Sequence, residues 1–166
     1  MKNTTVNVFT ENLYSDWDID ERKCIIYTRK IVKYFIKKFL DESCLNGFDF
    51  DTISFDILFC DSKKTHEINK EYRNKDYPAD IITFAIFADS DEKFILDNEI
   101  NLGEIILALD KVKEEARKNS VEDIYELYFL IAHGILHLLG FDHQTESEYN
   151  FIISAQKDVL KEVIGI

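Results

Sequence analysis

The sequence is poor in the residues that break regular structure. Only one proline and five glycines occur among 166 residues, and hydrophobic residues make up 46% of the chain. This composition excludes a disordered or low-complexity chain and leaves little room for a linker. Because a chain of this length usually forms one domain, we predict a single domain over residues 1–166.

Long hydrophobic runs are also missing. The apolar stretches span only a few residues each, and no hydrophobic segment follows the opening Met-Lys-Asn-Thr-Thr. A transmembrane helix needs about 20 apolar residues, and a signal peptide needs an apolar central region. We therefore expect no membrane partner and a cytoplasmic location.

Cysteines are few and form no motif. Cys24, Cys44 and Cys60 are odd in number, widely spaced and without a CxxC pair. This usage is typical of reduced thiols that pack as small apolar groups. None of the three is expected to bind zinc.

Positive charge is scarce as well. The chain holds 20 Lys and Arg against 32 Asp and Glu, which gives a net charge of −12. Proteins that hold nucleic acids through phosphate contacts usually carry a basic surface. A polyanionic substrate would therefore have to meet a local patch or be delivered by a partner. Basic residues gather at 29–38 and 63–75, and the first group is equally typical of a solvated helix face.

Apolar periodicity predicts four strands, and the acidic stretch 88–101 leaves room for a short fifth strand at 94–96. The four lie at residues 4–10, 48–59, 80–87 and 103–109. Helices are predicted at 20–41, 62–72, 110–119, 120–139 and from 145 onward. The expected N-caps are Asp61 or Ser62, Ser120 and Thr145. Strands and helices are interspersed rather than strictly alternating, which favours an α+β domain with a mixed sheet of about four strands packed with helices.

The histidines, in contrast, are clustered in one segment of the sequence. Three of its four histidines, His133, His137 and His143, fall in the segment HGILHLLGFDH. In a helix, the first two lie one turn apart on one face. Gly140 can adopt the left-handed conformation just past the helix end, which would bring His143 back toward them. His66 stands alone in a polar stretch and is expected at the surface.

Three neutral imidazoles with one open position are typical of a catalytic zinc site, whereas structural zinc usually has four ligands rich in cysteine. We therefore predict one Zn²⁺ per chain, held at the end of a C-terminal helix and the following turn. Three imidazoles also bind nickel, copper or cobalt, so the residues favour zinc without fixing it.

The same spacing occurs in HExxHxxGxxH metallopeptidases, but their general base is missing here. Gly134 occupies the glutamate position, and Met1 is the only methionine, so the methionine turn of that group is absent too. Peptide hydrolysis is therefore disfavoured. A glycine inside a helix costs about 1 kcal/mol relative to alanine, so Gly134 needs a reason such as close approach of a strand or of substrate.

HGILHLLGFDH resembles the HGxLHLxGxDH signature of the YbeY family, bacterial zinc endoribonucleases of ribosomal RNA maturation. Upstream, INKEYRNKDYPADIITF is similar to the family segment LNxxYRxxDxPTDVLSFP, and LGEI is similar to its LGDI. The differences from the family pattern are small: Ala79 replaces Thr, Ile82 and Thr83 replace Leu and Ser, and Ala85 replaces Pro.

The resemblance implies that His133, His137 and His143 are the metal ligands and that Arg73 is the catalytic arginine. The chemistry is consistent, because zinc lowers the pKa of bound water to about 7 and a guanidinium suits phosphate. From the residues alone, an ion pair of Arg73 with Asp76 or Asp80 is the alternative. Asp142 is expected to accept a hydrogen bond from a ligand imidazole or to cap the turn.

The resemblance further implies cleavage of single-stranded RNA, in maturation of the 3′ end of small-subunit (16S) rRNA and in ribosome quality control. A second hypothesis is a non-catalytic ribosome assembly factor that zinc stabilises and whose acidic surface binds a basic ribosomal protein of the small subunit. A metal-dependent hydrolase of another substrate is the third.

Overall fold

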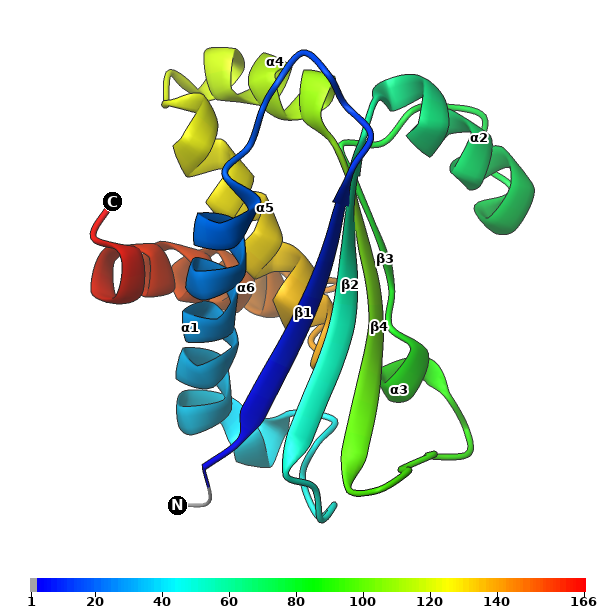
Figure 1. Cartoon of the computed structure of the whole chain (residues 1–166), viewed down its shortest axis with the longest axis vertical. Coiled ribbons are helices and arrows are strands. Elements are labelled where there is room, and N and C mark those ends of the chain that lie inside the picture. The colour runs from blue at the N-terminus through cyan, green and yellow to red at the C-terminus, as the bar shows by residue number, and fades with distance from the viewer. Residues whose placement is uncertain (1–2) are drawn as a thin grey trace.

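The computed structural model describes residues 3–166, and its strands form one mixed sheet (Figure 1). The strands are β1 (Thr5–Asn12), β2 (Thr52–Cys60), β3 (Ile81–Phe84) and β4 (Glu99–Ala108). Their order is β1-β2-β4-β3, with β1, β2 and β4 parallel and β3 antiparallel to β4. The predicted α+β class with a four-stranded mixed sheet is confirmed. The prediction that no leader is present rests on the first residues of the chain. Residues 1–2 lie outside the described residues.

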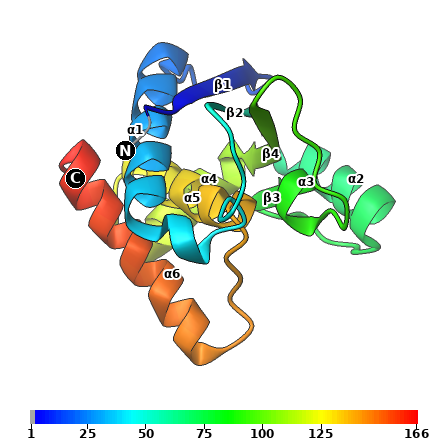
Figure 2. The same cartoon turned by 90° about the horizontal axis from the view of Figure 1, so that it is seen from below.

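The helices are α1 (Glu21–Phe39), α2 (Ser62–Arg73), α3 (Ile86–Asp89), α4 (Leu109–Asn119), α5 (Asp123–Leu138) and α6 (Glu146–Val159), with a 3-10 turn at Leu40–Glu42 and a π-helical turn at Leu160–Ile164. Helices α1 and α5 contact one face of the sheet, and α6 packs on both of them (Figure 2). None of the helices in residues 3–166 is long and apolar enough to cross a membrane.

The main core lies between the sheet and α5, because alternate side chains of the strands all point to that side. Ile53, Phe55, Ile57 and Phe59 of β2 are all buried there. A second, smaller cluster lies on the other face, where Ile68 of α2 packs against strand residues. The inner face is thus covered, and the outer face is covered only in part.

Three of the helix starts are capped by a side chain, and the caps at Asp61 and Thr145 are the predicted ones. The side chains of Asp20, Asp61 and Thr145 each accept a hydrogen bond from the backbone three residues on, in α1, α2 and α6 respectively. The predicted N-cap at Ser120 is wrong. Ser120 ends α4 in the left-handed conformation, with φ of 55°, and α5 begins only after Glu122. The N-cap position of α5 is Glu122, two residues further on, and its side chain makes no capping hydrogen bond.

The stretch from 80 to 109 differs most from expectation. Strand β3 ends at Phe84, since the chain turns at Ala85 into the short helix α3, which buries Phe87. Residues 94–96 form no strand: Leu96 makes a single bridge to Glu99 across a turn at Asp97 and Asn98, both of which have positive φ. The following strand begins at Glu99 rather than Gly103, because Ile100 and Leu102 already point into the core. Strand β2 likewise begins at Thr52, four residues later than predicted.

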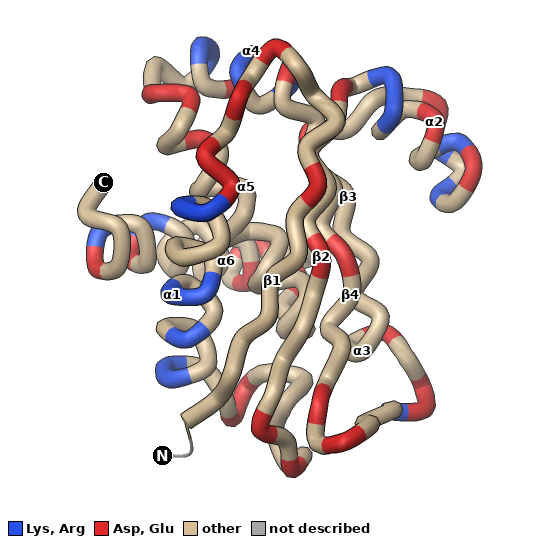
Figure 3. The backbone as a smooth tube through the Cα atoms, viewed as in Figure 1, with Lys and Arg blue, Asp and Glu red and all other residues tan. Residues whose placement is uncertain are grey.

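Charge is distributed unevenly along the chain. The basic residues of α1, from Arg29 to Lys38, are exposed, and Figure 3 shows them on the outer side of that helix. None of them lines the pocket of the histidines. The first basic group is therefore exposed and lies outside the histidine pocket, and its contact with a polyanion stays a prediction.

Candidate metal centre

Helix α5 carries His133 and His137 one turn apart. The helix is apolar on most sides and packs against β3 and β4, and Gly134 is what lets it approach so closely. A Cβ atom at Gly134 would lie 2.9 Å from Cδ1 of Ile105 and 3.1 Å from Cδ1 of Ile81. The predicted close approach of a strand is therefore the reason for this glycine, and it fixes the height of both histidines above the sheet.

The turn after α5 reverses the chain. Gly140 has φ of 94°, its N–H donates to the carbonyl of His137, and the N–H of Phe141 donates to the carbonyl of Leu136, each at 3.0 Å. This pair of bonds is the Schellman motif, which favours glycine at that position. The backbone N–H of Cys44 also donates to Leu139 at 2.8 Å, which ties the turn to the body of the domain. The reversed chain carries His143 back over the helix.

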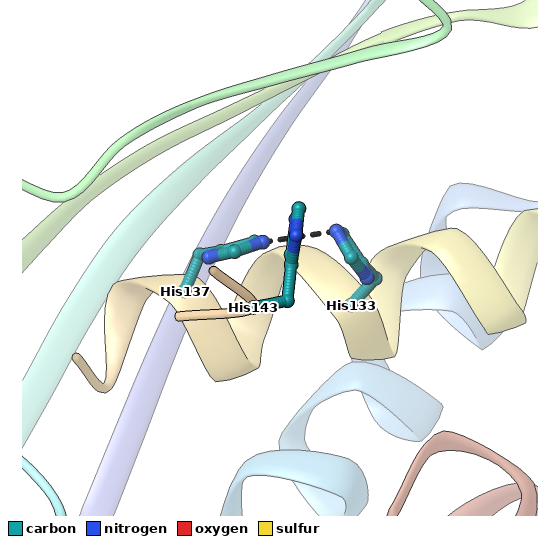
Figure 4. A group of neighbouring side chains, drawn as sticks. All are labelled: His133, His137 and His143. Atoms are coloured by element: carbon teal, nitrogen blue, oxygen red, sulfur yellow. Dashed lines mark hydrogen bonds between the residues drawn. The ribbon is translucent and has the colours of Figure 1, made fainter. Parts of the chain in front are cut away.

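The three imidazoles converge (Figure 4). Their ring centroids are 4.5 to 5.5 Å apart, and one nitrogen from each lies within 4.8 Å of the others. Nε2 of His133 lies 2.9 Å from Nε2 of His137. Tetrahedral zinc with bonds of about 2.0–2.1 Å separates its nitrogen ligands by about 3.3 Å, so the pair of His133 and His137 fits such an ion with a shift of a few tenths of an ångström. His133 and His137 are partly buried, and His143 is exposed.

The protein keeps two of these rings in the neutral form that binds metals. Burial is the main cause that lowers the pKa of His137 to about 4, and repulsion from His133 and His143 adds to it. Burial also lowers the pKa of His133, although a hydrogen bond to Gln156 opposes that shift. A neutral imidazole has a free lone pair, so both rings are ready to bind a cation near neutral pH.

Gln156 of α6 supports the cluster and was not singled out as a site residue by the sequence. Its Oε1 lies 3.3 Å from Nδ1 of His133, and its Nε2 donates to the carbonyl of Phe129 at 2.8 Å. The side chain is 1% exposed. The signal was present, because Gln156 is the one polar residue on the apolar stripe of the last helix, and a buried amide needs partners.

Arg73 lies at the C-terminal end of α2 and lines the same pocket as the three histidines. It is exposed, and Nη1 donates to Oδ1 of Asn69 at 3.3 Å. Neither predicted acidic partner binds it in the described structure: Asp76 pairs with His66 at 2.8 Å, and Asp80 accepts from the backbone N–H of Ile81. Among residues 3–166 no carboxylate forms an ion pair with Arg73, although Asp89 and Asp142 line the same pocket.

Asp142 and His66 are placed differently. The carboxylate of Asp142 accepts from the backbone N–H of His143 at 2.7 Å and from Nε2 of Gln144 at 2.8 Å. These are contacts within the turn, which agree with the capping alternative, and the role of acceptor for an imidazole stays a prediction. His66 is on the surface as predicted, with 39% of its side chain exposed. It takes no part in the cluster.

Comparison with known proteins agrees with this arrangement. The family model "Endoribonuclease YbeY" matches residues 12–164. An endoribonuclease YbeY from a Geobacillus species is 44% identical over 108 residues, which cover 63% of this chain and 69% of that protein. The Malacoplasma penetrans endoribonuclease YbeY is 34% identical over 154 residues, covering 93% and 94%.

A solved structure supports the fold. The solution structure of a Thermotoga maritima protein matches with a TM-score of 0.59 at 22% identity, covering 97% of this chain and 90% of that one. At that identity the match speaks for the fold alone. The sequence matches carry the family assignment, together with its activity class. The chain belongs to the YbeY family of endoribonucleases, and it is a nuclease of the hydrolase class.

Proposed function

We propose that this endoribonuclease depends on one zinc ion held by His133, His137 and His143. The observation that carries the proposal is the convergence of three imidazoles, two of them kept neutral, in a pocket that also holds an unpaired arginine. When bound, zinc supplies a Lewis acid and activates water near neutral pH, so no glutamate base is required. This agrees with the cluster itself, which contains no carboxylate among the described residues.

Each residue of the pocket then has a task that its chemistry supports. His133 and His137 offer lone pairs from a rigid helix, and His143 adds a third from the turn. Arg73, a planar and permanently charged group, would bind the scissile phosphate and stabilise the charge that develops on its oxygens. Asp142 holds the backbone N–H of His143 and so helps to fix the third ligand. We propose Arg73 as the catalytic residue and Asp142 as a support of the metal site.

The substrate that fits is single-stranded RNA. Arg73 is the one basic side chain other than the histidines in the pocket lining, and the chain as a whole carries a charge of −12, so the pocket itself offers no broad basic surface for a duplex. We propose that the cleavage serves maturation of the 3′ end of 16S rRNA and ribosome quality control in the cytoplasm, as the family resemblance implies. A partner bound to the ribosome would supply the affinity that this acidic chain lacks.

The test is cleavage of a fluorescent single-stranded RNA by the purified protein, with and without a chelator. Metal analysis of the same sample identifies the ion. His137→Ala should lose the metal and reduce the cleavage rate at least 100-fold, and zinc should restore activity to chelated wild type but not to the variant. Undiminished cleavage in the chelated protein would contradict the proposal.

Arg73 is tested separately, with an exposed lysine of the same helix as control. Arg73→Ala should keep its zinc and lose on the order of 10²–10³ in rate, because it removes a charge that acts on the transition state. Lys64→Ala removes a charge from the first turn of α2, outside the histidine pocket, and should lower the rate much less. Equal effects of the two variants would reduce Arg73 to a general electrostatic contribution.

A specific observation also favours the binding of a basic ribosomal protein of the small subunit. The groove on the outer sheet face combines apolar residues with three carboxylates, Glu67, Glu71 and Glu104, against one basic residue, Lys64. We propose that a basic partner binds there, which would bring the enzyme to the ribosome. Charge reversal at Glu67 and Glu71 should weaken binding to 30S subunits and leave cleavage of a short free RNA intact, whereas loss of both would contradict a separate docking role.

A further inference from the structure

Gln156 is a buried polar residue whose orientation the structure fixes completely. It lies in α6 with 1% of its surface exposed, and it reaches across to α5. The carbonyl of Phe129 can only accept a hydrogen bond, so the amide NH₂ of Gln156 must face it, at 2.8 Å. The amide oxygen is thereby turned toward Nδ1 of His133, at 3.3 Å.

An amide oxygen can only accept, and this decides where the proton of His133 sits. A neutral imidazole carries one N–H, and the hydrogen bond to Gln156 requires it at Nδ1. The lone pair is then on Nε2, which accepts the hydrogen bond from Nε2 of His137 at 2.9 Å in the metal-free molecule (Figure 4). In the opposite tautomer, Nδ1 and the amide oxygen would repel each other, and a proton would occupy the place of the ion.

We propose that Gln156 is a positioning residue that holds His133 as the Nδ1–H tautomer, so that the lone pair of His133 is on Nε2, the nitrogen turned toward the metal site. This inference rests on the metal site of the proposed function. Partners of this kind in the outer shell change metal affinity by about 10- to 100-fold. Gln156 touches neither the metal space nor the substrate pocket, so it acts only through His133.

The first test needs no metal. In the chelated protein, long-range ¹H–¹⁵N NMR spectra distinguish the two tautomers of each histidine. Wild-type His133 should be a single Nδ1–H tautomer, and Gln156→Leu, which keeps the approximate volume and removes the acceptor, should give a mixture or the Nε2–H form. An Nε2–H tautomer in the wild type, or an unchanged spectrum in Gln156→Leu, would overturn the proposal.

The second test measures affinity for zinc by competition with a chromophoric chelator. Gln156→Leu should weaken binding about 10- to 100-fold. Gln156→Glu keeps an acceptor oxygen for Nδ1 but loses the donor to Phe129, so it should restore the Nδ1–H tautomer and part of the affinity. Val159→Ala makes a packing defect in the same buried helix face without touching an imidazole, so it should lower the melting temperature and leave zinc affinity unchanged.

These outcomes separate the two proposals. Equal zinc affinity in Gln156→Leu and wild type would overturn the role of Gln156 while the metal site stands. Failure of the wild type to bind zinc would count against the proposed function, and the NMR measurement would still decide whether Gln156 orients the ring. A weakening by Val159→Ala as large as that by Gln156→Leu would show that packing alone controls affinity.

Discussion

Strand β3 separates two surfaces with different chemistry. Its residues Ile81 and Thr83 line the histidine pocket, whereas Phe84, which points the other way, lines the outer groove. The histidine pocket gathers nitrogen ligands and an arginine around one point. The outer groove presents exposed apolar side chains, such as Ile86, beside carboxylates that form no metal-binding cluster among the described residues.

The difference follows from the alternation of side chains along a strand. Helix α2 repeats the division, because Arg73 lines the histidine pocket while its neighbour Tyr72 lines the outer groove. Consecutive residues of one segment thus serve two surfaces, and a shift of one residue in the register of β3 would exchange them. The inner surface has the arrangement of a reaction centre, and the outer one has the composition of a docking surface.

The largest loss of stability is expected at Gly103, because this residue lets β4 lie against β3, the strand that lines both surfaces. Gly103 in β4 has φ of 128°, and a Cβ atom there would clash with the backbone carbonyl of Phe84 in β3. Gly103→Ala should therefore lower the free energy of unfolding by at least about 3 kcal/mol, since backbone must move and the conformation is strained. Chemical denaturation measures the loss.

Gly47 provides the control for this substitution. It also has positive φ, but no atom lies within 4 Å of an added Cβ. Gly47→Ala should cost only the conformational strain, about 1–2 kcal/mol. Equal losses in the two variants would show that strain, not the approach of β3, explains Gly103.

The next effect should be confined to the histidine pocket. Zinc at about 100 times its dissociation constant should raise the free energy of unfolding by about 2.7 kcal/mol if it binds only the folded state. A thermal melt with zinc and with chelator measures it. His143→Ala should lose this increment and still fold, because the side chain is exposed. A melting temperature that does not respond to zinc in the wild type would contradict the metal site, whereas Glu104→Gln on the outer face should respond as the wild type does.

Much of this site could be predicted from the sequence because its parts are local. The spacing of His133 and His137 gives one helical face, and Gly140 is a glycine where only a left-handed residue closes the turn. The three imidazoles converge through the local structure of the eleven residues 133–143. The four-stranded mixed sheet could be predicted for the same reason, since each strand has its own apolar alternation.

What could not be predicted depends on contacts between distant segments. Gln156 lies 23 residues from His133, and only the packing of α6 on α5 brings them together. The end of β3 at Phe84 is set by a helix that buries Phe87, although the local sequence continues to look like a strand. Ser120 has the composition of an N-cap and ends the preceding helix instead. In each case tertiary structure overrides a local preference.

A third prediction concerns acid and distinguishes the pocket from the rest of the molecule. In the metal-free protein, burial lowers the pKa of His137 from its ordinary 6.5 to about 4. Between these values the unfolded chain holds more protons, so His137 contributes fully to stability above pH 6.5 and loses that contribution as pH falls toward 4. The loss should be on the order of 2 kcal/mol, given its partial exposure.

The measurement is denaturation of the chelated protein between pH 7 and pH 4. Carboxylates titrate in the lower part of this range, so the informative quantity is the difference between wild type and His137→Gln. The variant should lose less stability on acidification, mostly above pH 5. Identical pH dependence in the two proteins would mean that the buried histidine is not coupled to folding.

The smallest effect should appear on the outer face, where the carboxylate of Glu104 is partly buried outside the histidine pocket. Desolvation raises the pKa of Glu104, and the nearby Asp56 raises it further. The folded state therefore disfavours the ionised form, so Glu104→Gln should stabilise the protein at pH 7 by less than about 1 kcal/mol, and the gain should vanish as pH falls below the ordinary value of 4.5. Glu67→Gln, an exposed change in the same groove, is the control and should leave stability unchanged. If Glu104→Gln destabilised the protein, the carboxylate would already have a favourable partner within the chain. That result would contradict an outer groove whose carboxylates are available to a basic protein.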